Sequence, residues 1–205
     1  MAAYQYKPVL MTNPVYDVIS NRILESFPTA CILYIDEIQN DYLLGRFEIA
    51  KKEMQEQMDA DRIRPLYKEV KVLQLFHGTT RECVNSISQE GFRRDLNKSS
   101  AYGVGTYFSP AAGFSWGYSL KETASICDMF LCDVLLGTLQ NDTQTLFTDG
   151  RPTVTKLPPK PKRTQPTKAP RFARISTSGP NIYCCPHDNH IYPRYVIAFH
   201  KTPPL

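Results

Sequence analysis

The residues best suited to chemistry are one histidine, two tyrosines and one serine, each close to glycines. An imidazole can donate or accept a hydrogen bond through either nitrogen, and the face of a tyrosine ring attracts a delocalised cation. Each segment alone says little, because a histidine after an apolar strand is more often a core residue and Gly-x-Gly is usually a turn. The segments are 75–80 (LFHGTT), 102–109 (YGVGTYFS), 115–118 (SWGY) and 181–183 (NIY).

In this order and at these separations, the four segments form a specific combination. They resemble the catalytic domain of the poly(ADP-ribose) polymerase-like (PARP-like) ADP-ribosyltransferases. The pattern of that family is His-Gly-Thr, then Tyr-Gly-x-Gly-x-Tyr-Phe, then Ser-x-x-Tyr, then a strand with the last position of a catalytic triad. A predicted helix from residue 13, the segment 38–40 and the segment 192–197 (YPRYVI) extend the resemblance over most of the chain. It implies an enzyme, an NAD+ ADP-ribosyltransferase, that uses NAD as a co-substrate and no metal.

The resemblance also implies a role for each residue around NAD. His77 would bond a ribose hydroxyl on the adenosine side, while the backbone of Gly78 and the hydroxyl of Ser115 would hold the nicotinamide amide. Tyr107 and Tyr118 would sandwich the pyridinium ring. Clamping and orienting the cofactor in this way favours departure of neutral nicotinamide without strong acid–base chemistry. The other implied NAD-binding residues are Thr79, Tyr102 and Gly103, with residues 93–101 flanking the adenosine end.

The third triad position distinguishes polymer-forming from single-addition members. It is glutamate in the polymer-forming members, and here it aligns with Ile182. A hydrocarbon side chain can neither accept a hydrogen bond nor act as a base, so elongation should fail. With His77, Tyr107 and Ile182 as the triad, the sequence resembles the His-Tyr-Ile mono-ADP-ribosyltransferases.

A competing constellation follows Ile182, in residues 184–190 (CCPHDNH). Its cysteines and histidines are possible zinc ligands, but adjacent cysteines in an extended chain point to opposite faces and the spacing fits no usual zinc motif. We expect buried or turn cysteines here rather than a metal site. A Cys–His protease is favoured still less, because nothing orients the pair.

The elements that must position the site are short and mixed. The apolar spacing predicts a helix over 13–27, strands over 30–39, 70–76, 129–136 and 192–200, and a segment over 43–58 that begins as strand and ends as helix. Thr79 and Glu82 have capping-box spacing for a short helix that Gly91 would end, and residues 94–105 read as a loop. Helices and strands do not alternate regularly, which favours an α+β fold. The resemblance specifies it as the ADP-ribosyltransferase fold, two packed, mainly antiparallel sheets with flanking helices, in one domain over 1–205.

The charge is unevenly distributed. The formal net charge is +4, but residues 151–174 contain eight basic residues, no acidic residue and six of the 16 prolines. Without these eight, 16 basic residues face 20 acidic ones, a balance of −4. Such a stretch reads as an extended loop inside the domain, and in the family this interval borders the acceptor side of the site.

Composition excludes several classes. No apolar run is long enough for a membrane span, and the N-terminus lacks the apolar region of a signal peptide, so we expect an intracellular protein, cytoplasmic or nuclear, that contacts no membrane. The expected partner is a protein acceptor, and the chain itself is one candidate. Two alternatives stay open: an inactive module that binds NAD or ADP-ribose, and an enzyme acting on nucleic acid, supported only by the basic residues of 151–174.

Overall fold

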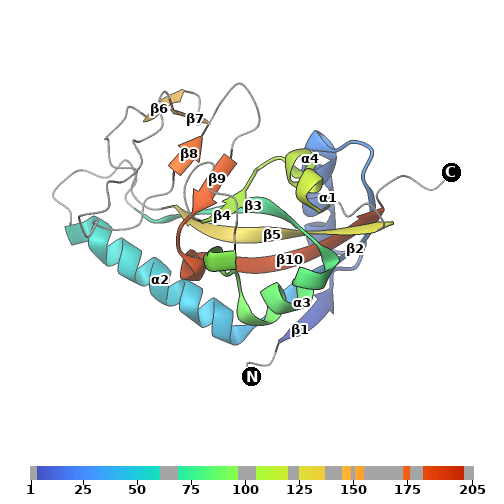
Figure 1. Cartoon of the computed structure of the whole chain (residues 1–205), viewed down its shortest axis with the longest axis horizontal. Coiled ribbons are helices and arrows are strands. Elements are labelled where there is room, and N and C mark those ends of the chain that lie inside the picture. The colour runs from blue at the N-terminus through green and yellow to red at the C-terminus, as the bar shows by residue number, and fades with distance from the viewer. Residues whose placement is uncertain are drawn as a thin grey trace.

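The computed structural model describes residues 4–60, 69–96, 105–119, 125–136, 145–148, 151–154, 173–175 and 182–200. Helices and strands are mixed along the chain, as in the expected α+β class (Figure 1). The helices are α1 (Pro14–Ser26), α2 (Asp41–Ala60), α3 (Arg81–Glu90) and α4 (Ala112–Ser115), with 3₁₀ turns η1 (Arg94–Leu96), η2 (Trp116–Tyr118) and η3 (Asp188–His190). The strands are β1 (Gln5–Pro8), β2 (Cys31–Gln39), β3 (Lys71–Thr79), β4 (Thr106–Phe108), β5 (Ile126–Leu136), β6 (Thr145–Thr148), β7 (Arg151–Val154), β8 (Ala173–Ile175), β9 (Ile182–Cys185) and β10 (Ile191–His200).

A five-stranded antiparallel sheet forms the centre of the molecule. Its strand order is β1-β2-β10-β5-β3, so β5 lies between β10 and β3. The sequence of β5, ICDMFLCDVLL, is apolar at nearly every position because both faces of this strand are covered. At the far side of β5, β3 brings the His-Gly-Thr segment to one edge of the sheet.

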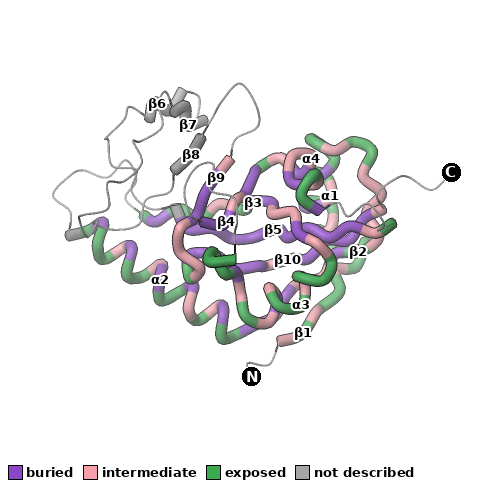
Figure 2. The backbone as a smooth tube through the Cα atoms, in the orientation of Figure 1, coloured by how far each residue is buried: buried purple, intermediate pink, exposed green. Residues whose placement is uncertain are grey.

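Helices cover both faces of this sheet (Figures 1 and 2). On one face, Ile19 and Ile23 of α1 pack against Met129 and Leu131 of β5. On the other face, α2 packs over the cluster that contains Phe130. Successive side chains of β5 thus enter opposite cores, as the two-residue period of a strand requires. Burial is concentrated in the central strands and on the inner side of α2 (Figure 2).

The prediction for 43–58 was wrong in its first part, which was expected as a strand, and right in its second part, because the whole segment lies in α2. Its buried side chains, Leu43, Phe47, Ala50, Met54 and Met58, recur at three- and four-residue steps. That spacing places them on one face of a helix.

Asn40, at the start of α2, reinforces this helical arrangement. Its Oδ1 accepts a hydrogen bond from the Leu43 backbone at 3.1 Å, and its Nδ2 donates to the carbonyls of Ser88 and Gln89 in α3. One buried amide therefore caps α2 and ties it to α3.

The described residues also form two smaller antiparallel ladders. One has the order β4-β9-β8, and the other is the β6-β7 pair. The Phe76–Ser109 bridge connects β3 of the large sheet to the segment just after β4, with hydrogen bonds of 2.7 and 2.9 Å. This bridge holds the β4–β9 ladder against the His-Gly-Thr strand.

The other predicted helices and strands agree with the structure except at two places. The predicted strands correspond to β2, β3, β5 and β10, and the helix predicted over 13–27 is α1, with Asn13 capping it. The capping box was wrong: Thr79 lies in β3, which runs on through His77, Gly78 and Thr79, and Thr80 precedes α3 without a side-chain cap bond. The expected loop over 94–105 begins with η1 instead, and residues 97–104 lie outside the described residues.

No helix within the described ranges is both long and apolar enough to span a bilayer.

Candidate active site

His77 is held from two directions. Its Nδ1 lies 2.8 Å from the carbonyl oxygen of Tyr107 in β4. Its ring meets Phe92 edge-on, with centroids 4.9 Å apart, and Phe108 at 5.5 Å. Burial lowers the pKa of His77 below its usual value, and the bond to the Tyr107 carbonyl offsets this in part. A carbonyl can only accept, so the neutral ring carries its proton on Nδ1 and has a lone pair on Nε2. Nε2 can therefore accept from a hydroxyl, as the expected ribose contact requires.

The backbone N–H and C=O of Gly78 face the free edge of β3, the edge away from β5. Along a strand, alternate residues direct their backbone groups to the same side. Phe76 pairs with Ser109 on the edge away from β5, and the Gln74 carbonyl on that edge accepts from Arg22 Nη2 at 2.8 Å. Gly78 comes next in this series, so its N–H and C=O point to the same edge. One donor beside one acceptor is the arrangement that a primary carboxamide complements.

The structure shows why position 78 is a glycine, which the sequence did not reveal. A Cβ at this position would lie 1.9 Å from the carbonyl oxygen of Ser115 and 3.0 Å from Ser119 Oγ. The glycine thus allows α4 and η2 to pack directly on β3. Packing within the protein already requires a glycine here, whatever ligand approaches the strand.

Ser115 lies beside this edge, but its hydroxyl hydrogen already takes part in a hydrogen bond within the protein. Its buried Oγ donates to the Phe76 carbonyl at 3.0 Å, which accepts from Ser109 as well. In this arrangement the hydroxyl keeps lone pairs that can accept from an amide N–H. The expected contact to nicotinamide is therefore available to Ser115 as an acceptor.

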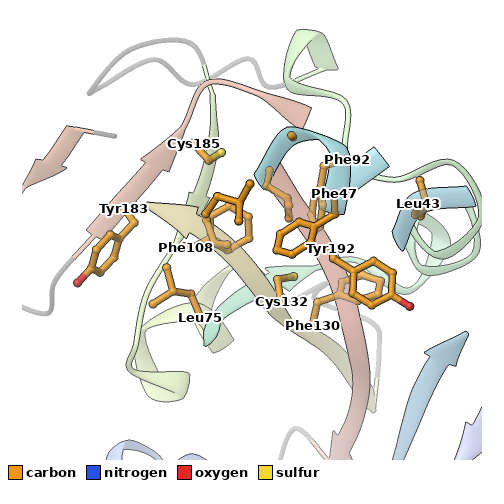
Figure 3. Close-up of a cluster of buried hydrophobic side chains, with 14 of the residues drawn as sticks. Leu43, Phe47, Leu75, Phe92, Phe108, Phe130, Cys132, Tyr183, Cys185 and Tyr192 are labelled. Carbon is orange, nitrogen blue, oxygen red and sulfur yellow. The ribbon is translucent and has the colours of Figure 1, made fainter. Parts of the chain in front are cut away.

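Tyr107 and Ile182 lie on one face of the small ladder. Tyr107 pairs with Cys184, and paired residues of an antiparallel ladder share a face. Ile182 is two residues from Cys184, so it lies on that face too. The opposite face, with Phe108, Tyr183 and Cys185, belongs to the hydrophobic core (Figure 3). Because the Tyr107 carbonyl also bonds His77, the three expected triad residues belong to one connected unit.

The other expected residues differ in their surroundings. Tyr118 is 64% exposed, its ring 5.7 Å from that of Phe114, and thus lies open to a ligand. Thr79 is buried and pairs with Asp128 of β5. Tyr102 and Gly103 lie outside the described residues, as does most of the basic stretch 151–174.

The structure adds residues that sequence reasoning missed. Phe92 and Phe108 enclose the His77 ring, and Ser109 pairs with the strand beside it. Phe92 directly follows Gly91, whose positive φ of 84° ends α3 and turns the chain back toward the core. An apolar residue directly after a helix-ending glycine was the available signal.

The cysteines after Ile182 are structural. Cys184 and Cys185 are buried in β9, and burial raises the pKa of both thiols. Cys185 Sγ donates to the His187 carbonyl at 3.2 Å. The part of the chain that the structure describes contains no group of three or more histidine, cysteine or acidic side chains placed to hold a metal.

Comparison with known proteins agrees with this geometry. Residues 19–201 match the family "Poly(ADP-ribose) polymerase catalytic domain". The chain is 26% identical over 197 residues to human protein mono-ADP-ribosyltransferase PARP14, covering 94% of this chain and 10% of that protein. It is 30% identical over 186 residues to mouse protein mono-ADP-ribosyltransferase PARP12, covering 90% of this chain and 24% of that protein.

A third relative is a probable poly(ADP-ribose) polymerase of Dictyostelium discoideum, 34% identical over 134 residues, or 63% of this chain and 38% of that protein. The chain therefore spans between a tenth and two fifths of the length of these relatives. The match over residues 19–201 includes β3, β4 and β9, the strands that carry His77, Tyr107 and Ile182. The chain belongs to the poly(ADP-ribose) polymerase catalytic domain family.

Proposed function

We propose that this protein is a mono-ADP-ribosyltransferase that transfers one ADP-ribose from NAD to each acceptor residue and releases nicotinamide. The observation that carries the proposal is Ile182, at the third triad position on the face of Tyr107. The mono-ADP-ribosyltransferases among the relatives support the same reaction.

The residues divide the reaction between two ends of NAD. Nε2 of His77 accepts from a ribose hydroxyl, while Gly78 and Ser115 bind the carboxamide of nicotinamide. The C–N bond to nicotinamide breaks with its electron pair going to the ring, which leaves as a neutral molecule. An acceptor oxygen then bonds to the ribose carbon. An acceptor carboxylate is already deprotonated, so it needs no base from the enzyme at the position of Ile182.

The test is incubation of the purified chain and candidate acceptor proteins with labelled NAD, followed by intact and peptide mass spectrometry. We expect nicotinamide release and single ADP-ribose units, each on a separate residue. His77→Ala should abolish both signals while a thermal unfolding curve shows that the variant folds.

Three outcomes would contradict the proposal. Two or more ADP-ribose units linked on one residue would indicate a polymerase. NAD binding without nicotinamide release would indicate a binding module. Label on RNA or DNA alone would indicate a nucleic-acid substrate.

The acceptor that we propose is an acidic protein surface, and a second copy of the chain is one candidate for it. The stretch 151–174, with eight basic residues, begins with β7 and ends within β8, and β8 pairs with β9 at Ile175 and Ile182. The positive charge is therefore connected to the strand that holds the third triad position. Opposite charge attracts an acidic partner to such a segment.

We also propose that the protein works inside the cell. Its six cysteines are free thiols, four of them buried, as is usual in a reducing compartment.

A further inference from the structure

Arg94 connects two parts of the site that no strand pairing joins. Its backbone N–H donates to Oδ1 of Asp188 at 3.0 Å, and its Nη1 donates to the carbonyl oxygen of Pro186. Both acceptors lie between β9, which carries Ile182, and β10. Arg94 thereby ties the start of η1 to the end of β9.

Phe92, two residues before Arg94, packs against His77. The two rings are edge-on, with an interplanar angle of 80° and centroids 4.9 Å apart. Phe92 is 5% exposed and also meets Phe108 of β4 at 5.7 Å. A close edge-on contact restricts rotation of the imidazole, so the position of Phe92 affects where Nε2 points.

These contacts connect His77 to β9 by two separate routes. On one side, Nδ1 of His77 bonds the Tyr107 carbonyl, and Tyr107 pairs with Cys184 of β9. On the other side, His77 contacts Phe92, and the segment of Phe92 returns to the end of β9 through Arg94. Arg94 supplies the hydrogen bonds that close the second side.

We propose that Arg94 is a positioning residue for NAD binding, which holds Phe92 against His77 so that Nε2 stays directed toward the NAD ribose. The proposal rests on the proposed function for its ligand. Its structural part, the link from Arg94 to His77, can be measured without NAD.

A matched control exists in Arg46 of α2. Its Nη2 donates to Oδ1 of Asn189, so it too binds the turn between β9 and β10. Arg46 is not part of the segment that carries Phe92. Arg46→Ala therefore removes an equal charge and loosens the same turn while it leaves the Phe92 connection intact.

The experiment follows the His77 imidazole by nitrogen-detected NMR over a pH titration in both variants, and then measures NAD affinity by calorimetry. For Arg94→Ala we expect the pKa of His77 to rise toward the ordinary 6.5 and both tautomers to appear. The variant removes the exposed bond from Nη1 to the Pro186 carbonyl and keeps the backbone bond to Asp188. Loss of the hydrogen bond between Nε2 of His77 and the ribose would correspond to about a tenfold weaker NAD affinity. Arg46→Ala should change neither quantity, although both variants unfold at a lower temperature.

Each contrary result has a distinct meaning. Weaker NAD binding in Arg94→Ala with an unchanged His77 spectrum would show that Arg94 contacts NAD directly and would overturn the proposal. Equal effects of both variants would assign the role to the turn as a whole and overturn it too. If Arg94→Ala does not fold, Arg94→Lys keeps one donor and should shift His77 in the same direction by less. If the wild type binds no NAD, the proposed function fails, and the His77 spectra still test the link to Arg94.

Discussion

The hydrogen bonds within the protein determine which atoms of this site can donate to a ligand and which can accept. Nδ1 of His77 donates a hydrogen bond to the Tyr107 carbonyl, so Nε2 on the other side of the ring is an acceptor. The Ser115 hydroxyl donates a hydrogen bond to the Phe76 carbonyl, so the lone pairs of its oxygen can accept a hydrogen bond. On the free edge of β3, Arg22 and Ser109 bind the backbone of Gln74 and Phe76 before Gly78 is reached. The site therefore offers two acceptors and one backbone donor–acceptor pair.

Gly78→Ala tests the contact between β3 and α4. The new Cβ would lie 1.9 Å from the Ser115 carbonyl, so α4 must move away from the strand. We expect the free energy of unfolding to fall by about 1–3 kcal/mol, the usual cost of overpacking, and NAD binding to be lost. Chemical denaturation and calorimetry measure the two effects.

Gly45→Ala is the matched control. Gly45 is exposed within α2, and a Cβ there meets no atom within 4 Å. Alanine should raise the free energy of unfolding by about 0.5–1 kcal/mol without changing NAD affinity, because it is the better helix former. Equal destabilisation by both substitutions would show that the Ser115 contact is not the cause.

His77 should make NAD binding dependent on pH. Its pKa in the folded protein is lowered, so the ring is neutral at pH 7 and gains a proton only below the ordinary value of 6.5. Protonation turns Nε2 into a donor, so the NAD dissociation constant should rise as pH falls through this range and stay constant above it. His77→Gln, which cannot titrate, should give a flat profile in the same calorimetric series. A wild-type profile that stays flat while NMR shows His77 gaining its second proton would contradict the assignment of Nε2.

At the level of elements, amphipathic segments were predictable where one period dominates and less so elsewhere. The period of α1 and the apolar run of β5 identified these elements correctly. Only the first part of α2 was misjudged, because Gly45 and the mixed polarity of 43–50 obscured a helical face that only tertiary packing makes evident. Asn40 was the local signal that was overlooked, since asparagine favours the N-cap of a helix.

The junction of β5, β3 and α3 contains an unusually buried acid. The side chain of Asp128 is 2% exposed, with Oδ2 3.5 Å from Arg81 Nη1. Burial raises the pKa of Asp128, and Arg81 counteracts this in part. An acid with a raised pKa costs stability once it ionises, so the free energy of unfolding should fall as pH rises above 3.8 through the raised pKa.

Two substitutions test this junction. Asp128→Asn should remove that pH dependence and raise stability at pH 7. Arg81→Ala should lower stability at pH 7 by about 1–2 kcal/mol, less than for a fully buried pair because Arg81 is half exposed. Denaturant titrations at a series of pH values from below 3.8 up to 7 measure both. The exposed pair of Lys52 and Glu56 is the control, since Lys52→Ala should cost at most about 0.5 kcal/mol.

For the whole molecule, the sequence predicted the α+β fold with its mainly antiparallel sheets, but not the contacts among the candidate site residues. Motif order grouped His77, Tyr107 and Ile182 as the expected triad, which stays a prediction. The contact between Phe92 and His77 depends on how α3 returns to the core, and the tie through Arg94 joins segments about 90 residues apart. Local sequence patterns carry no information over such a separation. The described residues also show an additional bridge between the two main sheets, at Phe76 and Ser109.

The uneven charge predicts how salt affects acceptor choice. Replacing the basic residues within 156–171 by glutamine should leave nicotinamide release unchanged but reduce modification of acidic acceptors. In the wild type that modification should weaken from low to high salt, because a Debye length of about 10 Å at 0.1 M screens surface charge. The variant should show little salt dependence. Equal acceptor labelling in both proteins at low salt would remove these residues from acceptor recognition.

The free edge of β3 also has a consequence for the rate at which single amides exchange with solvent. The N–H of Phe76 is bonded to Ser109, and those of His77 and Thr79 face β5, while that of Gly78 faces the open edge. Without a ligand, one fast-exchanging amide should therefore stand among slow neighbours. Nicotinamide alone, without the rest of NAD, should slow exchange at Gly78 and leave the flanking amides unchanged, so that a single backbone proton reports occupancy of the site.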